Sequence, residues 1–206
     1  MIAVVDYGMG NVRSICNAIE WCGQDALLTS DPRELDDATH LVLPGVGAFE
    51  DAMANLKSRR LDEILHRQVF DKKKPLLGIC LGLQLLAKVS EEHGRHAGLG
   101  WFDAEVVRFR PDNEKLKVPH IGWNTITIRK KHPLFDNLKN DERSFYFVHS
   151  YHMSCRNAED VIATCEYGIE FTAAVAQENI VATQFHPEKS QDNGMQVLEN
   201  YLKWSP

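Results

Sequence analysis

Apolar residues in the first half of the chain occur in short runs that alternate with segments of helical spacing. The short runs, bounded by turn or polar residues, predict strands at 2–6, 25–30, 40–45 and 75–79. Between them, the apolar positions predict helices over 12–22, 49–70 and 81–92. Strands that alternate with helices are joined by crossovers, so this pattern predicts parallel strands in an open α/β sheet.

The second half of the chain has a different pattern, in which strand-like segments follow one another closely. Segments rich in Val, Ile, Thr and aromatic residues predict strands at 104–109, 124–130, 144–153, 160–167, 170–177 and 179–185, before a last helix over 193–204. No repeat or linker interrupts the chain, so we expect a single domain over 1–206. The expected fold is an open, mostly parallel sheet flanked by helices, with an added antiparallel strand region in the second half.

Composition and charge exclude several classes of protein. With 23 basic and 29 acidic side chains the net charge is −6, which argues against nucleic acid or an anionic membrane as the main partner. No apolar run approaches the ~20 residues of a membrane span, and the N-terminus lacks the features of a signal peptide. The five cysteines are odd in number and include no CxxC pair, so we expect free thiols in a cytoplasmic protein.

The stretch GICLG places Cys80 where the fourth predicted strand passes into a helix. With Gly78 and Gly82 on either side, this corner has the form of a nucleophile elbow with cysteine in place of serine. The glycines remove side chains that would collide, the helix N-terminus favours a thiolate, and the N–H of Leu81 points where an oxyanion would form. A buried cysteine that only fills the core is the competing interpretation, and this motif alone does not decide between the two.

A thiol nucleophile needs a base, and the stretch QFHPEKS offers His186 together with Glu188 at the end of the last predicted strand. Strand ends are where sites form in open α/β sheets. A carboxylate two residues from the imidazole can hold its tautomer and stabilise the imidazolium. An exposed His-Pro turn followed by a solvated glutamate is the competing interpretation.

The stretch LPGVGAF follows the third predicted strand and carries Val46 between two glycines. Its backbone N–H groups could supply a second oxyanion donor, although an ordinary strand-to-helix turn has the same appearance. No glycine-rich phosphate-binding pattern occurs in the chain. A zinc site is disfavoured as well, because His149 and His152 would face opposite sides of a strand.

Taken together and in order, PGVGAF, GICLGLQLL and QFHPEKS resemble the class I, triad-type glutamine amidotransferase family, and the resemblance covers essentially the whole chain. The catalytic triad that it implies is Cys80, His186 and Glu188. The oxyanion hole that it implies comprises Val46, Gly47 and Leu81, and the glutamine-binding positions are Gln84, Glu92, His149, Ser150 and Tyr151. The implied reaction is hydrolysis of the glutamine side-chain amide through a cysteine thioester, without a cofactor and without a metal.

Within that family, VVDYGMGN, HIGWN and YFVHSYH resemble the glutaminase subunits of imidazole glycerol phosphate synthases, which act in histidine biosynthesis. Met9, where proline is common, and His152, where arginine is common, depart from that pattern, and neither touches the triad. The resemblance implies a heterodimer with a (β/α)8-barrel cyclase that receives the ammonia. The positions that it places at this interface are Asn11, Trp123, Tyr146 and Lys189.

Other interpretations remain open on the sequence alone. The chain could be the glutaminase subunit of another ammonia-channelling synthase, with the same fold and triad and a different partner. It could instead be a non-catalytic protein that uses Cys80 as a redox-sensing thiol, which would not need His186 and Glu188 together and would release no glutamate from glutamine. A cysteine peptidase is disfavoured because nothing marks an extended substrate groove.

Overall fold

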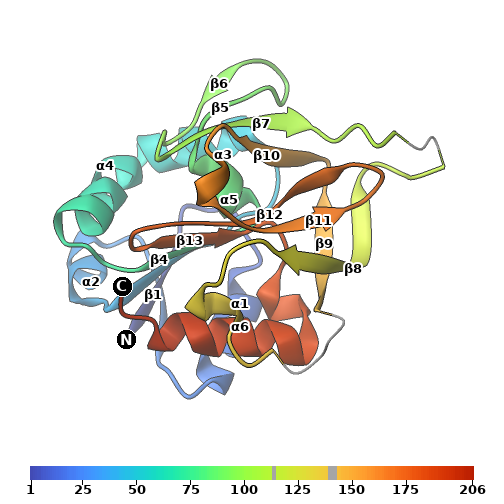
Figure 1. Ribbon diagram of the computed structural model, residues 1–206. Coiled ribbons are helices and arrows are strands. Elements are labelled where there is room, and N and C mark those ends of the chain that lie inside the picture. The colour runs from blue at the N-terminus through green and yellow to red at the C-terminus, as the bar shows by residue number, and fades with distance from the viewer. Residues whose placement is uncertain (113–114, 139–142) are drawn as a thin grey trace.

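The chain folds around a large sheet whose strands run parallel in one half and antiparallel in the other (Figure 1). The computed structural model describes residues 1–112, 115–138 and 143–206. Within these residues the large sheet has nine strands in the order β2-β1-β3-β4-β13-β12-β11-β8-β9. Its parallel half consists of β2 (Ala26–Thr29), β1 (Ile2–Val5), β3 (His40–Leu43), β4 (Leu76–Ile79) and β13 (Ile180–Thr183).

The antiparallel half comes from the second half of the chain, as the sequence predicted. It consists of β12 (Glu170–Gln177), β11 (Val161–Glu166), β8 (His120–Ile128) and β9 (Ser144–His149). This mixed α/β architecture confirms the predicted fold class. Because β4 and β13 are parallel neighbours, the segments that follow Ile79 and Thr183 leave the sheet at the same edge.

A second, smaller sheet was not predicted. Among the described residues it has four strands in the order β10-β7-β5-β6, namely β10 (Tyr151–Cys155), β7 (Phe102–Arg108), β5 (Ala87–Ser90) and β6 (His96–Ala97). The prediction of one strand over 144–153 is wrong for this reason. β9 pairs with β8 in the large sheet, whereas β10 pairs with β7 in the small one, and the chain passes between them at Ser150.

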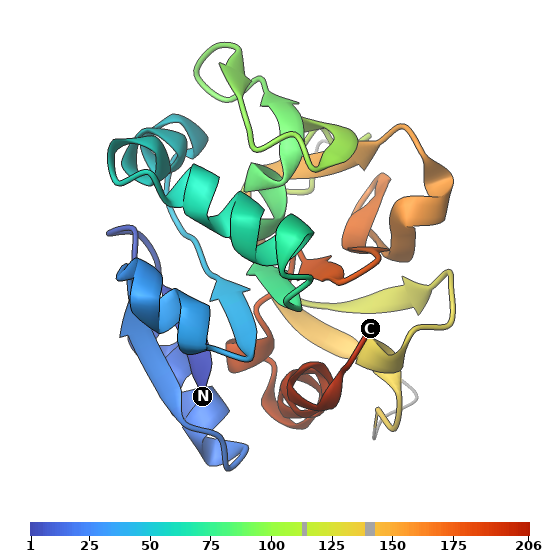
Figure 2. The same ribbon diagram turned by 90° about the vertical axis from the view of Figure 1, so that its left-hand side faces the viewer.

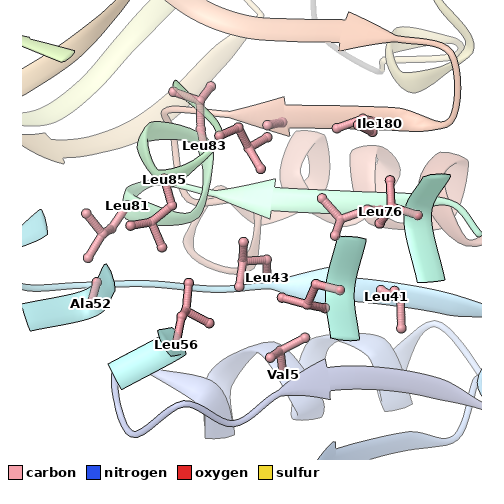
Figure 3. Packing of buried hydrophobic residues seen from close by; sticks show 14 of the residues in the cluster. Val5, Leu41, Leu43, Ala52, Leu56, Leu76, Leu81, Leu83, Leu85 and Ile180 are labelled. Atoms are coloured by element: carbon pink, nitrogen blue, oxygen red, sulfur yellow. The ribbon is translucent and has the colours of Figure 1, made fainter. Parts of the chain in front are cut away.

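Helices cover both faces of the large sheet (Figures 1 and 2). One face carries α1 (Val12–Trp21) and α6 (Gln191–Lys203), and the other carries α2 (Pro32–Asp37), α3 (Phe49–Ser58), α4 (Leu61–His66), a π-helix (Arg67–Asp71) and α5 (Leu81–Leu85). Alternation along β1 divides the core, since Ile2 and Val4 pack on the α1 side and Ala3 and Val5 on the α3 side. Figure 3 shows the α3 side, where leucines of β3, β4, α3 and α5 meet.

Two predicted helices are shorter than their sequence patterns indicated. The pattern over 49–70 breaks at Arg60, whose φ of 56° is left-handed and cannot continue a right-handed helix. The pattern over 81–92 forms a helix only in α5, because Ala87–Ser90 pairs with β6 and β7 as strand β5. Strand pairing in the tertiary structure here overrides local helix propensity.

The remaining helices are short. Three-ten helices span Pro133–Phe135, Ala158–Asp160 and Pro187–Lys189. The sequence did not predict α2, although Asp31 caps its first turn and Pro32 occupies its first position. In the part of the chain that the structure describes, no helix combines the length and the apolar character that crossing a membrane requires.

Candidate active site

Cys80 occupies a strained corner between β4 and α5. Its φ of 55° and ψ of −107° lie outside the regions that residues other than glycine usually adopt. A Cβ added to Gly82 would lie 1.9 Å from the carbonyl oxygen of Leu43, and one added to Gly78 would lie 3.0 Å from Cβ of Ala182. The two glycines therefore allow the close passage of strand and helix, and the corner has the backbone form of a nucleophile elbow.

The helix that follows Cys80 stabilises a negative charge less strongly than the sequence indicated. α5 has only five residues, so its dipole is small. The N–H groups of Leu83 and Gln84 donate to the carbonyl oxygen of Cys80, whereas those of Leu81 and Gly82 come before the first hydrogen bond of the helix. At this corner, individual N–H groups rather than a long helix dipole are therefore what could stabilise a negative charge.

The thiol of Cys80 is almost enclosed, with 6% of the residue exposed. Its Sγ lies 3.7 Å from Nε2 of Gln184 and 3.8 Å from the carbonyl oxygen of Val148. A thiol can donate to the carbonyl oxygen, whereas the amide N–H of Gln184 donates to the sulfur. The sulfur thus has a polar partner in both its protonated and its ionised form.

His186 and Glu188 form a buried pair just after β13. Nδ1 of His186 lies 2.8 Å from Oε1 of Glu188, and the two side chains are 2% and 0% exposed. Because a carboxylate only accepts, Nδ1 carries the proton of the neutral ring, and Nε2 keeps the lone pair of a base. Among the described residues Nε2 has no hydrogen-bond partner. Burial lowers the pKa of His186, but the charges of nearby Cys80 and then of Glu188 outweigh burial and raise it.

Hydrogen bonds hold the loop after β13 against β9. The N–H of His186 donates to the carbonyl oxygen of Tyr146 at 2.9 Å. The hydroxyl of Ser190 donates to the carbonyl oxygen of His186 at 2.6 Å and accepts from the N–H of Tyr146 at 2.9 Å. Both polar groups of the Tyr146 backbone are therefore connected to the segment that carries His186.

A cavity of about 420 Å³ lies over this corner and brings together most of the residues predicted from the sequence. The predicted residues that line it are Val46, Gly47, Cys80, Leu81, Gln84, Glu92, His149, Ser150, Tyr151, His186 and Lys189. Pro119 and Val148 also line it and were not predicted. Of the other predicted residues, Glu188 is paired with His186, whereas Asn11, Trp123 and Tyr146 lie outside the cavity lining.

Polar residues of the cavity wall already have protein partners. Nε2 of Gln84 donates to the carbonyl oxygen of Tyr151 at 2.9 Å and to Oε1 of Gln184 at 3.1 Å. Both amide protons of Gln84 are used, so only its Oε1 is left to contact a ligand. Oε2 of Glu92 accepts from the N–H of Phe49 at 2.8 Å and thereby stabilises the start of α3.

Two buried histidines lie beside the predicted glutamine-binding positions. Nδ1 of His149 must donate to the carbonyl oxygen of Tyr151, 2.9 Å away, so its Nε2 accepts from Nδ1 of His120 at 3.0 Å. Burial lowers the pKa of His120 to about 4 and that of His149 to about 3. His152 lies in the other sheet, and in the described part of the chain no group of three or more His, Cys, Asp or Glu could hold a metal ion.

The PGVG loop rests on the buried hydroxyl of Tyr7. Oη of Tyr7 donates to the carbonyl oxygen of Pro44 at 2.6 Å. A Cβ added to Gly45 would lie 2.5 Å from Oη of Tyr7, so the loop can approach this hydroxyl only with a glycine there. Burial, and then the charge of Cys80, raises the pKa of Tyr7, so the hydroxyl keeps the proton that it donates. Gly47 is needed for another reason, because its φ of +100° is one that other residues rarely adopt.

An exposed aromatic and basic surface adjoins the cavity. Trp123 of β8 pairs with Tyr146 of β9, with ring centroids 6.2 Å apart, and Nζ of Lys189 lies 5.8 Å from the centroid of the Tyr146 ring. Trp123 is 47% exposed, and Ile121 on the same face of β8 is 58% exposed. We refer to Ile121, Trp123, Tyr146 and Lys189 as the mouth patch.

Sequence reasoning missed three residues that shape this site. Gln184 lies within QFHPEKS, and its signal is a polar side chain at the buried end of an apolar strand. Ser190 is the last residue of the same stretch, and a serine just before a helix is a recognisable cap residue. Tyr7 gave no local signal, because its contact with Pro44 joins residues that are distant in sequence.

Similarity to known proteins extends over the whole chain. Residues 3–204 match the family model described as glutamine amidotransferase class-I. The imidazole glycerol phosphate synthase subunit HisH 2 of Nitrobacter winogradskyi is 52% identical, over 100% of this chain and 99% of that protein. The subunit of the same name from Methanococcus maripaludis is 51% identical, over 98% and 99%. The solved structure of PurLQS from Thermotoga maritima shares the fold, with a TM-score of 0.75 at 18% identity over 98% of this chain and 96% of that chain.

Proposed function

Because the chain belongs to the class I glutamine amidotransferase family, we propose that it is the glutaminase subunit of an imidazole glycerol phosphate synthase. It hydrolyses glutamine to glutamate and ammonia, and the ammonia passes to a cyclase subunit in histidine biosynthesis. The observation that carries this proposal is the identity of 52% and 51%, over nearly full length, with two proteins of that name. The cavity that Cys80 and His186 share supports the chemistry.

In the first half of the reaction, Nε2 of His186 takes the thiol proton of Cys80. The thiolate attacks the side-chain carbonyl carbon of glutamine, a C–S bond forms, and the carbonyl π electrons move onto oxygen. When the tetrahedral intermediate collapses, the C–N bond breaks and the imidazolium gives its proton to the leaving nitrogen. Ammonia departs and a glutamyl thioester remains.

In the second half, water attacks the thioester while His186 accepts one of its protons. The C–S bond breaks, glutamate forms, and the sulfur leaves as a thiolate beside the imidazolium. Glu188 holds the ring through Nδ1 and stabilises its positive charge, which agrees with the raised pKa of His186. No step requires a cofactor.

Two backbone N–H groups form the oxyanion hole of this mechanism, those of Leu81 and Gly47. Losing one such donor costs about 3–4 kcal/mol of transition-state stabilisation. We place control of the reaction in the peptide between Val46 and Gly47, which can rotate at low steric cost because glycines flank Val46. In one orientation its carbonyl repels the substrate oxygen, and in the other its N–H completes the hole.

Glutamine binds between α5 and the passage from β9 to β10. Since both amide protons of Gln84 are engaged, its Oε1 accepts from the α-ammonium group of the substrate. The carboxylate of Glu92 neutralises the same group, while the backbone at Ser150 and Tyr151 meets the α-carboxylate. The hydrogen bonds of His149 to His120 and to the carbonyl oxygen of Tyr151 keep this segment in place.

The partner is a (β/α)8-barrel cyclase that docks on the mouth patch and forms a heterodimer. Exposed Trp123 beside Tyr146 and Lys189 gives the aromatic and cationic character that is enriched in protein interfaces. The resemblance adds Asn11 to this interface, and a Cβ on neighbouring Gly10 would lie 3.5 Å from Pro44, where the PGVG loop begins. Docking there favours the orientation of the loop that completes the oxyanion hole.

The test is glutamate release by the purified chain alone, with the cyclase subunit, and with the cyclase and its nucleotide ligand. We expect almost no glutamate release by the chain alone and strong release by the complex with its nucleotide ligand. Lack of release in every arm refutes the glutaminase function. Full activity of the chain alone refutes partner control and leaves the hydrolytic function standing.

We also propose a cytoplasmic location and one domain over residues 1–206. All five cysteines are free, as suits a reducing compartment. One family model spans residues 3–204, which supports a single domain. Fractionation of cells and limited proteolysis of the purified chain test the two statements.

A further inference from the structure

Gln184 lies directly after β13, between Gln84 and the sulfur of Cys80, and the mechanism above gives it no role. We propose that Gln184 positions the nucleophile by donating an N–H···S hydrogen bond, and that it connects the sulfur to the strand that binds glutamine. The part that concerns glutamine rests on the proposed function. The contact with Cys80 does not.

The orientation of the Gln184 amide follows from its partners. The carbonyl oxygen of Tyr151 can only accept, so the amide atom of Gln84 that lies 2.9 Å from it is the nitrogen. The same nitrogen lies 3.1 Å from the amide of Gln184 and donates to it, so the atom that it meets is Oε1. The other amide atom of Gln184, Nε2, then faces Sγ of Cys80 at 3.7 Å.

Because Gln184 is buried, its contact with Cys80 affects the ionisation of the thiol. Gln184 is 0% exposed, so solvent does not reach the residue to replace a lost partner of its N–H. A buried N–H without an acceptor is costly, and an ionised acceptor gives a stronger hydrogen bond than a neutral one. The N–H of Gln184 therefore favours the thiolate over the thiol, and it does so without taking up a proton.

The contact also decides where the ionised sulfur lies. The carbonyl oxygen of Val148 lies 3.8 Å from Sγ, where it accepts from a thiol but repels a thiolate. The N–H of Gln184, by contrast, attracts the thiolate. When His186 removes the proton, this difference holds the sulfur away from Val148. Attack on a bound amide then starts from one defined position of the sulfur, as an efficient reaction requires.

A continuous chain of hydrogen bonds connects Cys80 to the glutamine-binding segment. It runs from Sγ through Gln184 and Gln84 to the carbonyl oxygen of Tyr151. That carbonyl oxygen also accepts from Nδ1 of His149, so its position is fixed from two directions. A ligand that moves the Tyr151 backbone must therefore move the amide that holds the nucleophile.

Three variants separate this role from a general loosening of the strand end. Gln184→Met keeps a similar volume and removes both the N–H and the Oε1 that accepts from Gln84, and Gln184→Asn keeps an amide but draws it back by one methylene. Thr183→Val is the matched control, because Thr183 is also 0% exposed and its hydroxyl donates to the carbonyl oxygen of Phe185 at 3.0 Å rather than to sulfur.

The first measurement is the rate at which iodoacetamide alkylates Cys80 in the full chain, followed by peptide mass spectrometry from pH 5 to 10. At neutral pH we expect Gln184→Met to slow alkylation about tenfold and to move the midpoint of the profile to higher pH, with a smaller effect in Gln184→Asn. We expect the profile of Thr183→Val to match the parent. A parent-like profile in both Gln184 variants, or an equal shift in Thr183→Val, overturns the proposal.

The second measurement is glutamate release by the complex with cyclase. We expect kcat to fall by a factor similar to that seen in alkylation. We expect KM to change by a smaller factor, because Gln84 loses its acceptor on Gln184 in Gln184→Met but keeps its hydrogen bond to the carbonyl oxygen of Tyr151. A rise in KM with kcat unchanged would contradict the proposal. If the parent complex releases no glutamate, the proposed function fails, while alkylation still decides the role of Gln184. Should Gln184→Met not fold, Gln184→Asn decides it.

Discussion

The hydroxyl of Ser190 donates a 2.6 Å hydrogen bond to the carbonyl oxygen of His186. The hydroxyl oxygen of Ser190 in turn accepts from the N–H of Tyr146, whose ring lies beneath Lys189 in the mouth patch. One hydroxyl therefore connects the outer surface of β9 with the residue that we propose as the base. A partner that displaces Tyr146 would change the position of His186 through this contact.

Ser190→Ala should weaken the coupling between docking and hydrolysis. The change leaves the N–H of Tyr146 and one acceptor site of His186 without their partner, at a cost of about 1–3 kcal/mol in unfolding free energy. We expect the ratio of glutamate release with and without cyclase to fall about tenfold. The control is Ser154→Ala, at an exposed position of β10. An unchanged ratio in Ser190→Ala would remove this residue from the coupling.

Cys80→Ala should abolish glutamine-dependent synthesis by the complex and leave ammonia-dependent synthesis intact. Ammonia added from solution reaches the cyclase without the nucleophile, so only the glutaminase step is lost. The measurement is product formation with glutamine or with an ammonium salt, and Cys16→Ala serves as a control at a thiol of α1. Activity with glutamine that survives in Cys80→Ala would rule out the assignment of the nucleophile.

Glu188→Gln should be milder than His186→Ala, because the imidazole stays in place but loses the carboxylate that orients it. We expect His186→Ala to resemble the loss of the nucleophile and Glu188→Gln to retain measurable hydrolysis. The carboxylate raises the pKa of His186, so the pH profile of kcat should also change in Glu188→Gln. The control is Glu20→Gln at an exposed position of α1. Parent-like activity over the whole pH range would show that Glu188 is not the orienting group.

Lys189→Ala tests the mouth patch. Lys189 directly follows Glu188 and lines the cavity, so an acidic residue of the partner that binds it would also fix the end of the triad. We expect activation by cyclase to fall roughly tenfold while ammonia-dependent synthesis by the complex persists. Lys57→Ala, at an exposed position of α3, is the control. Complete retention of activation would exclude Lys189 and would leave the proposal for the PGVG loop standing.

Buried histidines should make the fold less stable in mild acid. The pKa of His120 is about 4 and that of His149 about 3 in the folded chain, against about 6.5 in an unfolded chain. Above pH 6.5 both states are neutral at these residues, and below it the unfolded chain binds protons that the folded chain does not. Each histidine then lowers the free energy of unfolding by about 1.4 kcal/mol per pH unit until its folded pKa is reached.

Urea unfolding of the chain at pH 7, 6 and 5 measures this loss, and His120→Phe separates the contribution of one ring. Compared with the parent, the variant should show a shallower decline of the unfolding free energy below pH 6.5. The effect of His186 has the opposite sign, because its raised pKa adds stability below pH 6.5 that is lost at higher pH. Equal slopes in the parent and in His120→Phe would contradict the assignment of His120 as a neutral buried ring.

Features encoded by neighbouring residues could be predicted from the sequence. The corner at Cys80 depends on Gly78 and Gly82, and the pairing of His186 with Glu188 spans two positions. Each of these arrangements is set by turn geometry that a short motif specifies. The parallel direction of β1 to β4 could be predicted because strands alternate with helices along this part of the chain.

Features that depend on distant contacts could not be predicted. Residues 81–92 have helical spacing, but whether the chain after α5 continues as helix or joins a sheet depends on β7, which lies later in the sequence. The polar partners of Gln184 come from α5 and from the corner at Cys80. A buried glutamine can be recognised from its flanking apolar residues, but the atom that it faces cannot.

The single residue Ser150 carries the chain from the large sheet to the small one. Cys80 and His186 follow strands of the large sheet, whereas Tyr151 begins a strand of the small sheet and Glu92 follows one. In the mechanism proposed above, the reacting groups thus lie in one hydrogen-bonded sheet, whereas Tyr151 and Glu92, which we propose to contact the amino-acid end of the substrate, lie at the other. Such a division allows substitutions to retune substrate preference in one layer while the reactive layer is inherited unchanged.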